Sequence, residues 1–216
     1  DQSALADWID RVFGPRKYYL ISLVIVLYAL LPFFMAFEGR KPEVRELVVL
    51  ATMIALATAG RAAFFMTPSF KPIIAIVIIS AIAFGAEAGF LVGSMTMLVS
   101  NFLFGQGPWT PWQMFAMGFI GFLSGILYRL RILPTKRLQL SVYGFLVTFM
   151  IYGGIMNPAA LFMSVYQFSW SGLLAIYISG VPVDLVHASS TFLFLWIGAK
   201  PLLEKLQRIK VKYGLL

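Results

Sequence analysis

The most constraining feature of this sequence is a series of apolar runs close to 20 residues long. The chain has 216 residues, of which 60% are hydrophobic and 12% are charged, whereas soluble domains carry about a quarter charged residues. A helix of about 20 apolar residues is long enough to cross a bilayer. Within lipid the backbone must satisfy its own hydrogen bonds. We therefore expect an all-α integral membrane protein.

Seven spans follow from these runs. We place them at residues 18–37, 46–66, 72–85, 88–104, 113–130, 138–156 and 182–203. The third, at 14 residues, is only about 21 Å long, which is thin for a full crossing. Residues 1–17 are interpreted as an extracellular or interfacial lead-in.

Residues 157–180 are ambiguous, because they are apolar enough to insert yet carry Asn157, Gln167 and several serines. We interpret this segment as lying at the outer surface, with the last helix beginning at Pro182. Proline suits the first helical position, and Asp184 would then sit in the first turn, where a carboxylate complements the helix dipole.

The basic residues indicate the topology. Twelve of the 17 lysines and arginines lie in the segments 38–45 and 129–137 and in the C-terminal tail, whereas the opposite loops hold only Lys71. The positive-inside rule makes the basic segments cytoplasmic. The C-terminus is then cytoplasmic and the N-terminus extracellular. The same rule accounts for the net charge of +8, so nucleic acid is not expected as a partner. If 157–180 crossed, the basic loops could not all share one side.

Several chemistries are disfavoured. The sequence has no cysteine and one histidine, so a disulfide, a thiolate nucleophile and a histidine-based metal site are not expected. It also lacks a P-loop, G-x-S-x-G and H-E-x-x-H. We therefore expect no catalytic residues, no metal and no cofactor, and any energy for active transport must come from another subunit.

Polar residues collect toward the outer face of the expected helices. Arg61 lies about 7 Å below the outer end of its helix, where an arginine marks a site by default or else snorkels to the interface. The loops 64–72 and 101–113 add aromatic rings, amides and one cation, which suit either a ligand pocket or an aromatic belt. Asp184 and His187 could contact ligand or bond each other. The candidate ligand residues are Arg61, Lys71, Asn101, Gln106, Trp109, Trp112, Gln113, Asn157, Asp184 and His187.

Small residues recur every four positions on three of the expected helices. The stripes are Ala51, Ala55, Ala59 and Ala63; Gly85, Gly89 and Gly93; and Gly121 with Gly125. Such stripes let membrane helices approach closely. They serve packing within one chain or contact with a partner, and spacing alone favours internal packing.

Together, several segments resemble one transporter family. They are Ala51-x-x-x-Ala55 and the stretches 70–78, 85–93, 105–113, 182–187 and 198–206. The chain resembles the S-components of energy-coupling factor (ECF) transporters over residues 46–210, which would form the six-helix core, with residues 18–37 as one extra N-terminal transmembrane helix.

The resemblance implies a bacterial plasma-membrane protein that captures a vitamin at the outer face and binds no cofactor. It would then topple beside a transmembrane coupling protein driven by two ATPase subunits. By this analogy Ala51, Ala55 and Ala59 face the coupling protein, which favours the partner interpretation of that stripe.

The ligand that the resemblance favours is cobalamin. The stretch Gly107-Pro-Trp-Thr-Pro-Trp112 looks most like the predicted cobalamin S-components. Amides and aromatics suit a corrinoid, and Arg61 or Lys71 could meet its phosphate. Another vitamin or a queuosine-like base stays open, as does a membrane scaffold or receptor that transports nothing.

Overall fold

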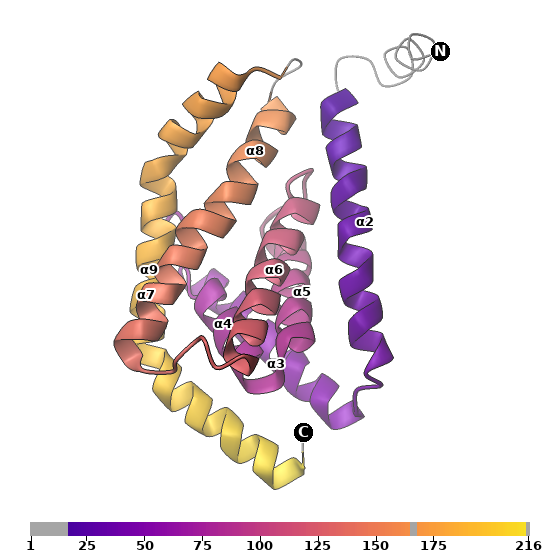
Figure 1. Cartoon of the computed structure of the whole chain (residues 1–216), viewed down its shortest axis with the longest axis vertical. Helices are drawn as coiled ribbons and strands as arrows, with labels where there is room; N and C mark the ends of the chain where they lie inside the picture. The colour runs from indigo at the N-terminus through magenta and orange to yellow at the C-terminus, as the bar shows by residue number, and fades with distance from the viewer. Residues whose placement is uncertain (1–16, 165–167, 215–216) are drawn as a thin grey trace.

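The computed structural model describes residues 17–164 and 168–214, and these residues form helices joined by short loops (Figure 1). The elements are α2 (Lys17–Gly39), α3 (Val44–Ala63), α4 (Ile73–Phe84), α5 (Ala86–Phe104), α6 (Thr110–Arg129), α7 (Arg137–Val147), the π-helical turn η2 (Thr148–Tyr152), α8 (Gly153–Ser164) and α9 (Trp170–Tyr213). The all-helical membrane fold expected from the sequence is confirmed, while the lead-in at 1–16 lies outside the described residues.

Within the described part of the chain, six helices are long and apolar enough to cross a membrane. One of them joins α7, η2 and α8 into a continuous helix from Arg137 to Ser164. The exception is α4, whose 12 residues extend only about 18 Å. Every residue of α4 is buried, so its short length is compensated by the helices around it.

The expected boundary near residue 182 is wrong. The sixth span continues to Ser164, and α9 begins at Trp170, twelve residues before Pro182. Ser169 caps α9, because its Oγ accepts a hydrogen bond from the Gly172 amide at 3.1 Å. Pro182 therefore lies inside a helix, which membrane helices tolerate, and Asp184 is not in a first turn. Residues 157–164 and 170–180 form the two arms of a helical hairpin at the upper end of Figure 1.

Helices α5 and α6 pack through their glycines. A Cβ at Gly89 would come within 2.8 Å of the Gly121 carbonyl oxygen, and one at Gly125 within 2.5 Å of the Ala86 nitrogen. A Cβ at Gly93 would overlap the Met117 carbonyl. These two glycine stripes therefore serve internal packing, as the spacing predicts.

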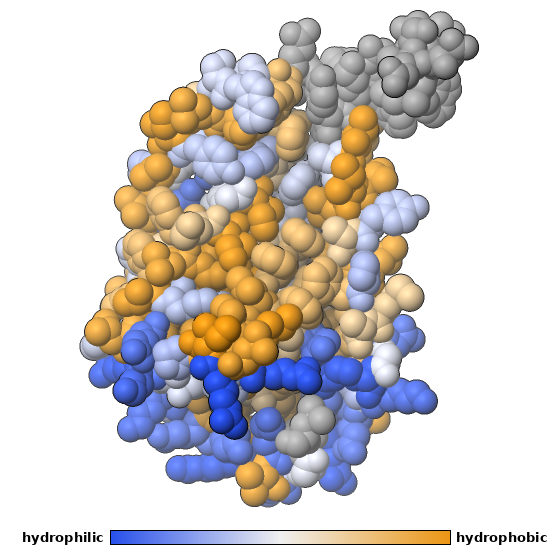
Figure 2. Space-filling model, in the orientation of Figure 1, coloured by the Kyte–Doolittle hydropathy of each residue, from blue (hydrophilic) through white to orange (hydrophobic). Residues whose placement is uncertain are grey.

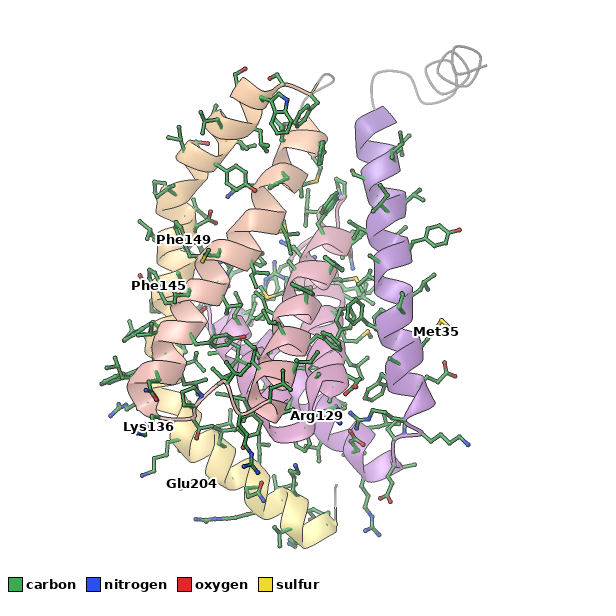
Figure 3. All side chains as sticks on the ribbon, viewed as in Figure 1. Met35, Arg129, Lys136, Phe145, Phe149 and Glu204 are labelled. Atoms are coloured by element: carbon green, nitrogen blue, oxygen red, sulfur yellow. The ribbon has the colours of Figure 1, made fainter. Side chains whose placement is uncertain are left out.

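The extra helix α2 packs against α5 and α6 through phenylalanines. Phe33 stacks on Phe90 with ring centroids 4.2 Å apart and meets Phe122 edge-on at 4.9 Å, while Phe34 meets Phe90 at 5.7 Å. The opposite side of α2 is exposed, as at Tyr28 (69%), and Figure 3 shows Met35 pointing away from the bundle. A helix with one packed side and one exposed apolar side suits a lipid-facing position.

Hydrophilic residues gather at the lower end of the face shown in Figure 2, and the charged residues Arg129, Lys136 and Glu204 lie toward that end (Figure 3). The last part of α9 turns beneath the other helices there (Figure 1), after Pro201, a residue type that commonly kinks helices. Lys210 Nζ donates to the Ala83 carbonyl at 2.6 Å. This cation satisfies a free carbonyl at the C-terminal end of α4 and complements the helix dipole.

Arg40 completes the same end of the molecule. Its guanidinium pairs with Glu46 of α3 and lies 3.5 Å from Glu87 of α5. It also donates to the Phe84 carbonyl at 3.5 Å. One arginine thus ties the starts of α3 and α5 to the end of α4.

Candidate functional site

Arg61 is the centre of a polar network in the half of the molecule opposite the charged end. It lies in the last turn of α3, and its Nη1 donates to Ser100 Oγ at 2.6 Å and to Asn101 Oδ1 at 2.7 Å. The guanidinium also lies over the Phe104 ring, 5.2 Å from its centroid, a cation–π arrangement. Its Nε and Nη2 have no hydrogen-bond partner among the described residues. The hydrogen-bonding capacity of these two nitrogens is therefore not used by the described residues.

Asn101 shapes the loop that follows α5. Its side chain is fully buried, and its Nδ2 donates to Thr110 Oγ1 and Gln113 Oε1, both at 2.9 Å. Thr110 in turn donates to Gln106 Oε1 at 2.8 Å, and Gln106 Nε2 donates to the Leu98 carbonyl at 3.2 Å. Asn101 and Gln106 therefore hold the loop before α6 in place. Their polar atoms are largely used within the protein.

Lys71 holds the loop between α3 and α4. Its Nζ donates to the carbonyls of Phe64 and Thr67, both at 2.8 Å, and Ser190 of α9 donates to the Lys71 carbonyl at 2.9 Å. Partial burial, and then the nearby Arg61 charge, lower the pKa of the Lys71 ammonium. The loop therefore brings a second cation close to Arg61.

Neither cation has an acidic partner. Within residues 17–164 and 168–214 the ion pairs are those of Arg40 at the other end of the molecule. Two like charges that interact without a counter-charge disfavour each other, and a bound anion would relieve that repulsion. The arrangement of Arg61 and Lys71 therefore suits an anionic group.

Three phenylalanines fix the position of this loop. Phe64 and Phe70 of the loop pack on Phe194 of α9, with ring centroids 5.1 and 5.5 Å away. Aromatic contacts of this kind add to the stabilisation from burial. The loop that carries Lys71 is thus attached to α9 by packing as well as by the Ser190 hydrogen bond.

Tyr152 and His187 join the two sides of the site. Tyr152, the last residue of η2, meets the His187 ring of α9 edge-on at 4.7 Å. Besides α9, the turn η2 packs against α6, the helix that carries Gln113. Five helical elements, α3, α5, α6, η2 and α9, therefore contribute to one region.

Asn157 and Asp184 form a pair next to that region. Asn157 Nδ2 of α8 donates to Asp184 Oδ2 of α9 at 2.8 Å. Asp184 therefore bonds Asn157, not His187, which packs on Tyr152.

The tryptophans of the 105–112 loop point in different directions. Trp109 is 40% exposed, so it is accessible from outside the bundle. Trp112 lines an apolar crevice of about 500 Å³ between α2, α6 and α8 and lies 6.3 Å from the Phe162 ring. The structure thus brings Arg61, Lys71, Gln113 and His187 together, and places Trp112 on the side that faces α2.

The alanine stripe of α3 faces outward. Ala51, Ala55 and Ala59 are exposed, while Met53 and Ala57 face the core. Internal packing, which the spacing favours, is therefore not the role of these alanines in this chain. They form a smooth strip on the surface.

The family comparison matches most of the chain. The family model described as "ECF-type riboflavin transporter, S component" matches residues 41–208. The chain belongs to the S components of ECF-type transporters. No curated protein and no solved structure matches it. The matched range begins after α2, so the extra helix lies outside it.

Membership of this family establishes the general role of the protein. It is the substrate-binding subunit of an ECF transporter, a multi-pass protein of the bacterial plasma membrane, and not an enzyme. S components bind the ligand that is transported and carry no cofactor. Membership also implies a partnership with the ECF module in the membrane.

Two site residues were not found from the sequence. Ser100 accepts a hydrogen bond from Arg61 and Tyr152 packs on His187, but each lies within an apolar run of the sequence. The only available signal for Tyr152 is the Gly153-Gly154 pair that follows it, and glycine pairs often mark irregular helix geometry.

Proposed function

We propose that this S component captures cobalamin at the outer face of the membrane. The observation that carries this choice is the pair of cations, Arg61 and Lys71, without an acidic partner in the described chain. Cobalamin carries one phosphodiester, and an arginine with two free donor nitrogens is suited to bind it.

The surroundings of the cations suit the rest of a corrinoid. Trp109 and the phenylalanines around Arg61 and Lys71 offer apolar contact, while Gln113, His187 and Asn157 offer polar groups for amide side chains. Because Asn101 and Gln106 are used inside the protein, we assign them a supporting role in loop shape.

Riboflavin is the second candidate, because the matching family model names it. It is flat and smaller than a corrinoid, and pockets of a few hundred Å³ commonly hold ligands of its size. Riboflavin carries no charged group at neutral pH, however, so it would leave Arg61 and Lys71 uncompensated. This difference separates the two candidates.

We also infer how the subunit is coupled. The exposed strip of Ala51, Ala55 and Ala59 lets a partner helix approach α3 closely, and we propose that the transmembrane coupling protein docks there, with two ATPases supplying energy. By the positive-inside rule we assign the basic lower end to the cytoplasm, and we therefore propose that the N-terminus and the site face outward.

Calorimetric titration of the purified protein with cobalamin, cobinamide and riboflavin tests the ligand. Cobinamide is the informative control, since it keeps the corrin but lacks the nucleotide loop with its phosphodiester. We expect cobalamin to bind most tightly and cobinamide at least tenfold more weakly. Tight binding of riboflavin without binding of cobalamin would overturn the cobalamin proposal in favour of riboflavin. If none of these vitamins binds, a scaffold or receptor that transports nothing is favoured.

A further inference from the structure

A groove between α8 and α9 holds a carboxylate within the membrane-spanning helices. It has a volume of about 360 Å³, and Asn157, Tyr177 and Asp184 supply its polar side chains. A charged side chain in a spanning helix is expensive, so its presence marks a functional site by default. No cation balances Asp184 at ion-pair distance in the described chain.

Two glycines make room for the polar pair. A Cβ at Gly153 would come within 2.6 Å of Asp184 Oδ2, and a Cβ at Gly180 would come within 2.5 Å of Asn157 Oδ1. Both distances are too short for any larger residue to fit without displacing the pair. The backbone is therefore shaped around these two side chains from both helices.

The helix is irregular at the same place. Gly153 follows directly on the π-helical turn η2, and single π-helical turns inside α-helices occur frequently at functional sites. Tyr177 donates to the Gly154 carbonyl at 2.9 Å, so its hydroxyl proton is already in use. This hydrogen bond joins α8 to α9, so it holds the two helices that line the groove together.

The free polar groups of the groove are mainly acceptors, and the second N–H of Asn157 Nδ2 is the unused amide donor among the described residues. Asp184 Oδ2 accepts from Asn157 Nδ2 at 2.8 Å, while Asp184 Oδ1 and Asn157 Oδ1 accept no hydrogen bond from the described residues. An unpaired acceptor in a low-dielectric setting costs free energy until a donor reaches it. A ligand that enters here is therefore recognised mainly through N–H or O–H groups, and a carboxamide can also accept from the unused N–H of Asn157.

The groove and the Lys71 loop lie along the same stretch of α9. His187 follows Asp184 by one helical turn and packs on Tyr152, and Ser190, one turn further on, donates to the Lys71 carbonyl at 2.9 Å. The site consequently has two poles, one with cationic donors and one with mainly acceptors, with Tyr152 and His187 between them. A ligand that spans both must carry an anion at one end and neutral donors at the other.

We propose that Asp184 and Asn157 bind the primary carboxamide groups of the corrinoid and exclude analogues that carry carboxylates there. This inference rests on the proposed function and adds a selectivity determinant to it. A carboxamide donates N–H to the free oxygens, whereas a carboxylate in its place cannot donate and is repelled by Asp184.

The test compares cobalamin with its monocarboxylic acid derivatives, in which one peripheral carboxamide is hydrolysed. Calorimetry on the wild type should show at least one derivative bound tenfold or more weakly than cobalamin. In Asp184→Asn we expect that discrimination to fall to threefold or less, while cobalamin itself loses about tenfold in affinity. Ser179→Ala, an exposed change on the same helix, should behave as the wild type.

A second variant protects the test against misfolding of the first. Gly153→Ala keeps the charge but pushes a methyl group against Asp184, so it should also weaken discrimination. If cobalamin binds the wild type and both variants keep wild-type discrimination, or if no derivative is disfavoured by the wild type, this inference is overturned and the proposed function stands. Absence of cobalamin binding to the wild type would overturn both.

Discussion

At the scale of single residues, the site depends on which polar atoms the protein leaves unused. Asn101 is buried, and both the oxygen and the nitrogen of its side-chain amide are hydrogen-bonded within the protein. Its role is therefore to position Arg61 and the 105–112 loop. Arg61 keeps two donor nitrogens free. Arginine and asparagine on neighbouring helices therefore have different roles, although both were candidates from the sequence alone.

The charge of Lys71 provides a prediction at this scale. Lys71→Gln keeps a donor for the loop carbonyls but removes the cation, so cobalamin affinity should fall roughly ten- to a hundredfold, the usual worth of a charge-assisted hydrogen bond. Cobinamide affinity should change less than threefold, because it lacks the phosphodiester. Calorimetry checks both, with the exposed Lys136→Gln at the other end as control. Equal losses for both ligands would show that Lys71 does not meet the phosphate.

A substitution of Arg61 should lower both cobalamin affinity and the stability of the fold. In Arg61→Gln we expect a larger loss for cobalamin than in Lys71→Gln, since the variant loses the free guanidinium nitrogens as well as the contacts to Ser100 and Asn101. Thermal unfolding measured beside the titration separates the two effects. Unchanged affinity for cobalamin would remove Arg61 from the site.

Some of this site could be predicted from residue types. Arg61, Lys71, Gln113 and His187 stand out because charged, amide and imidazole groups are rare in apolar runs. The pairing of Asp184 with Asn157 could not be predicted, because it depends on where α9 begins. Pro182 resembled a helix start, while the actual start is set by Ser169, which serves as a cap only if the preceding residues leave the helix.

At the scale of helices, the small residues divide into two groups that the spacing did not separate. The glycines of α5 and α6 face each other across a close contact, whereas the alanines of α3 face outward. Both groups recur every four residues, so periodicity predicts a smooth helix face. It does not predict whether a helix of the same chain or something outside the chain packs on that face. Which face is covered depends on the tertiary arrangement.

The glycine contact predicts opposite effects for two similar substitutions. Gly121→Ala should lower the free energy of unfolding by about 1–3 kcal/mol, because its methyl group would overlap the Gly89 backbone. Gly198→Ala has no atom within 4 Å of the new methyl and should be neutral or stabilise by up to about 1 kcal/mol. Denaturation in detergent compares the two. A tolerated Gly121→Ala would contradict the packing described for α5 and α6.

The alanine strip predicts a separation of binding from transport. Ala55→Trp adds a large side chain to an exposed position, so cobalamin binding should stay within threefold of the wild type while cellular uptake falls at least tenfold. Tyr28→Trp, on the exposed side of α2, is the matched control and should leave uptake unchanged. Normal uptake by Ala55→Trp would rule out this strip as the coupling surface.

At the scale of the whole molecule, charge and hydropathy divide the chain into two ends. The lower end, which is hydrophilic in Figure 2, holds the loops between α2 and α3 and between α6 and α7 and the turn of α9 beneath the bundle (Figure 1), and the candidate ligand residues lie toward the other end. Hydropathy alone predicts most spans, because lipid admits few alternatives to a helix. It does not predict the length of α9 or the irregular turn η2, which depend on capping and on packing between helices.

The orientation and the ligand are tested together by one measurement on intact cells. The chain has no cysteine, so Pro108→Cys, in the exposed loop before α6, carries a single thiol for a membrane-impermeant maleimide. We expect labelling from outside the cell, and a slower rate when cobalamin is added but not when riboflavin is added. Labelling only from the cytoplasmic side, or a rate that cobalamin leaves unchanged, would contradict an outward-facing cobalamin site.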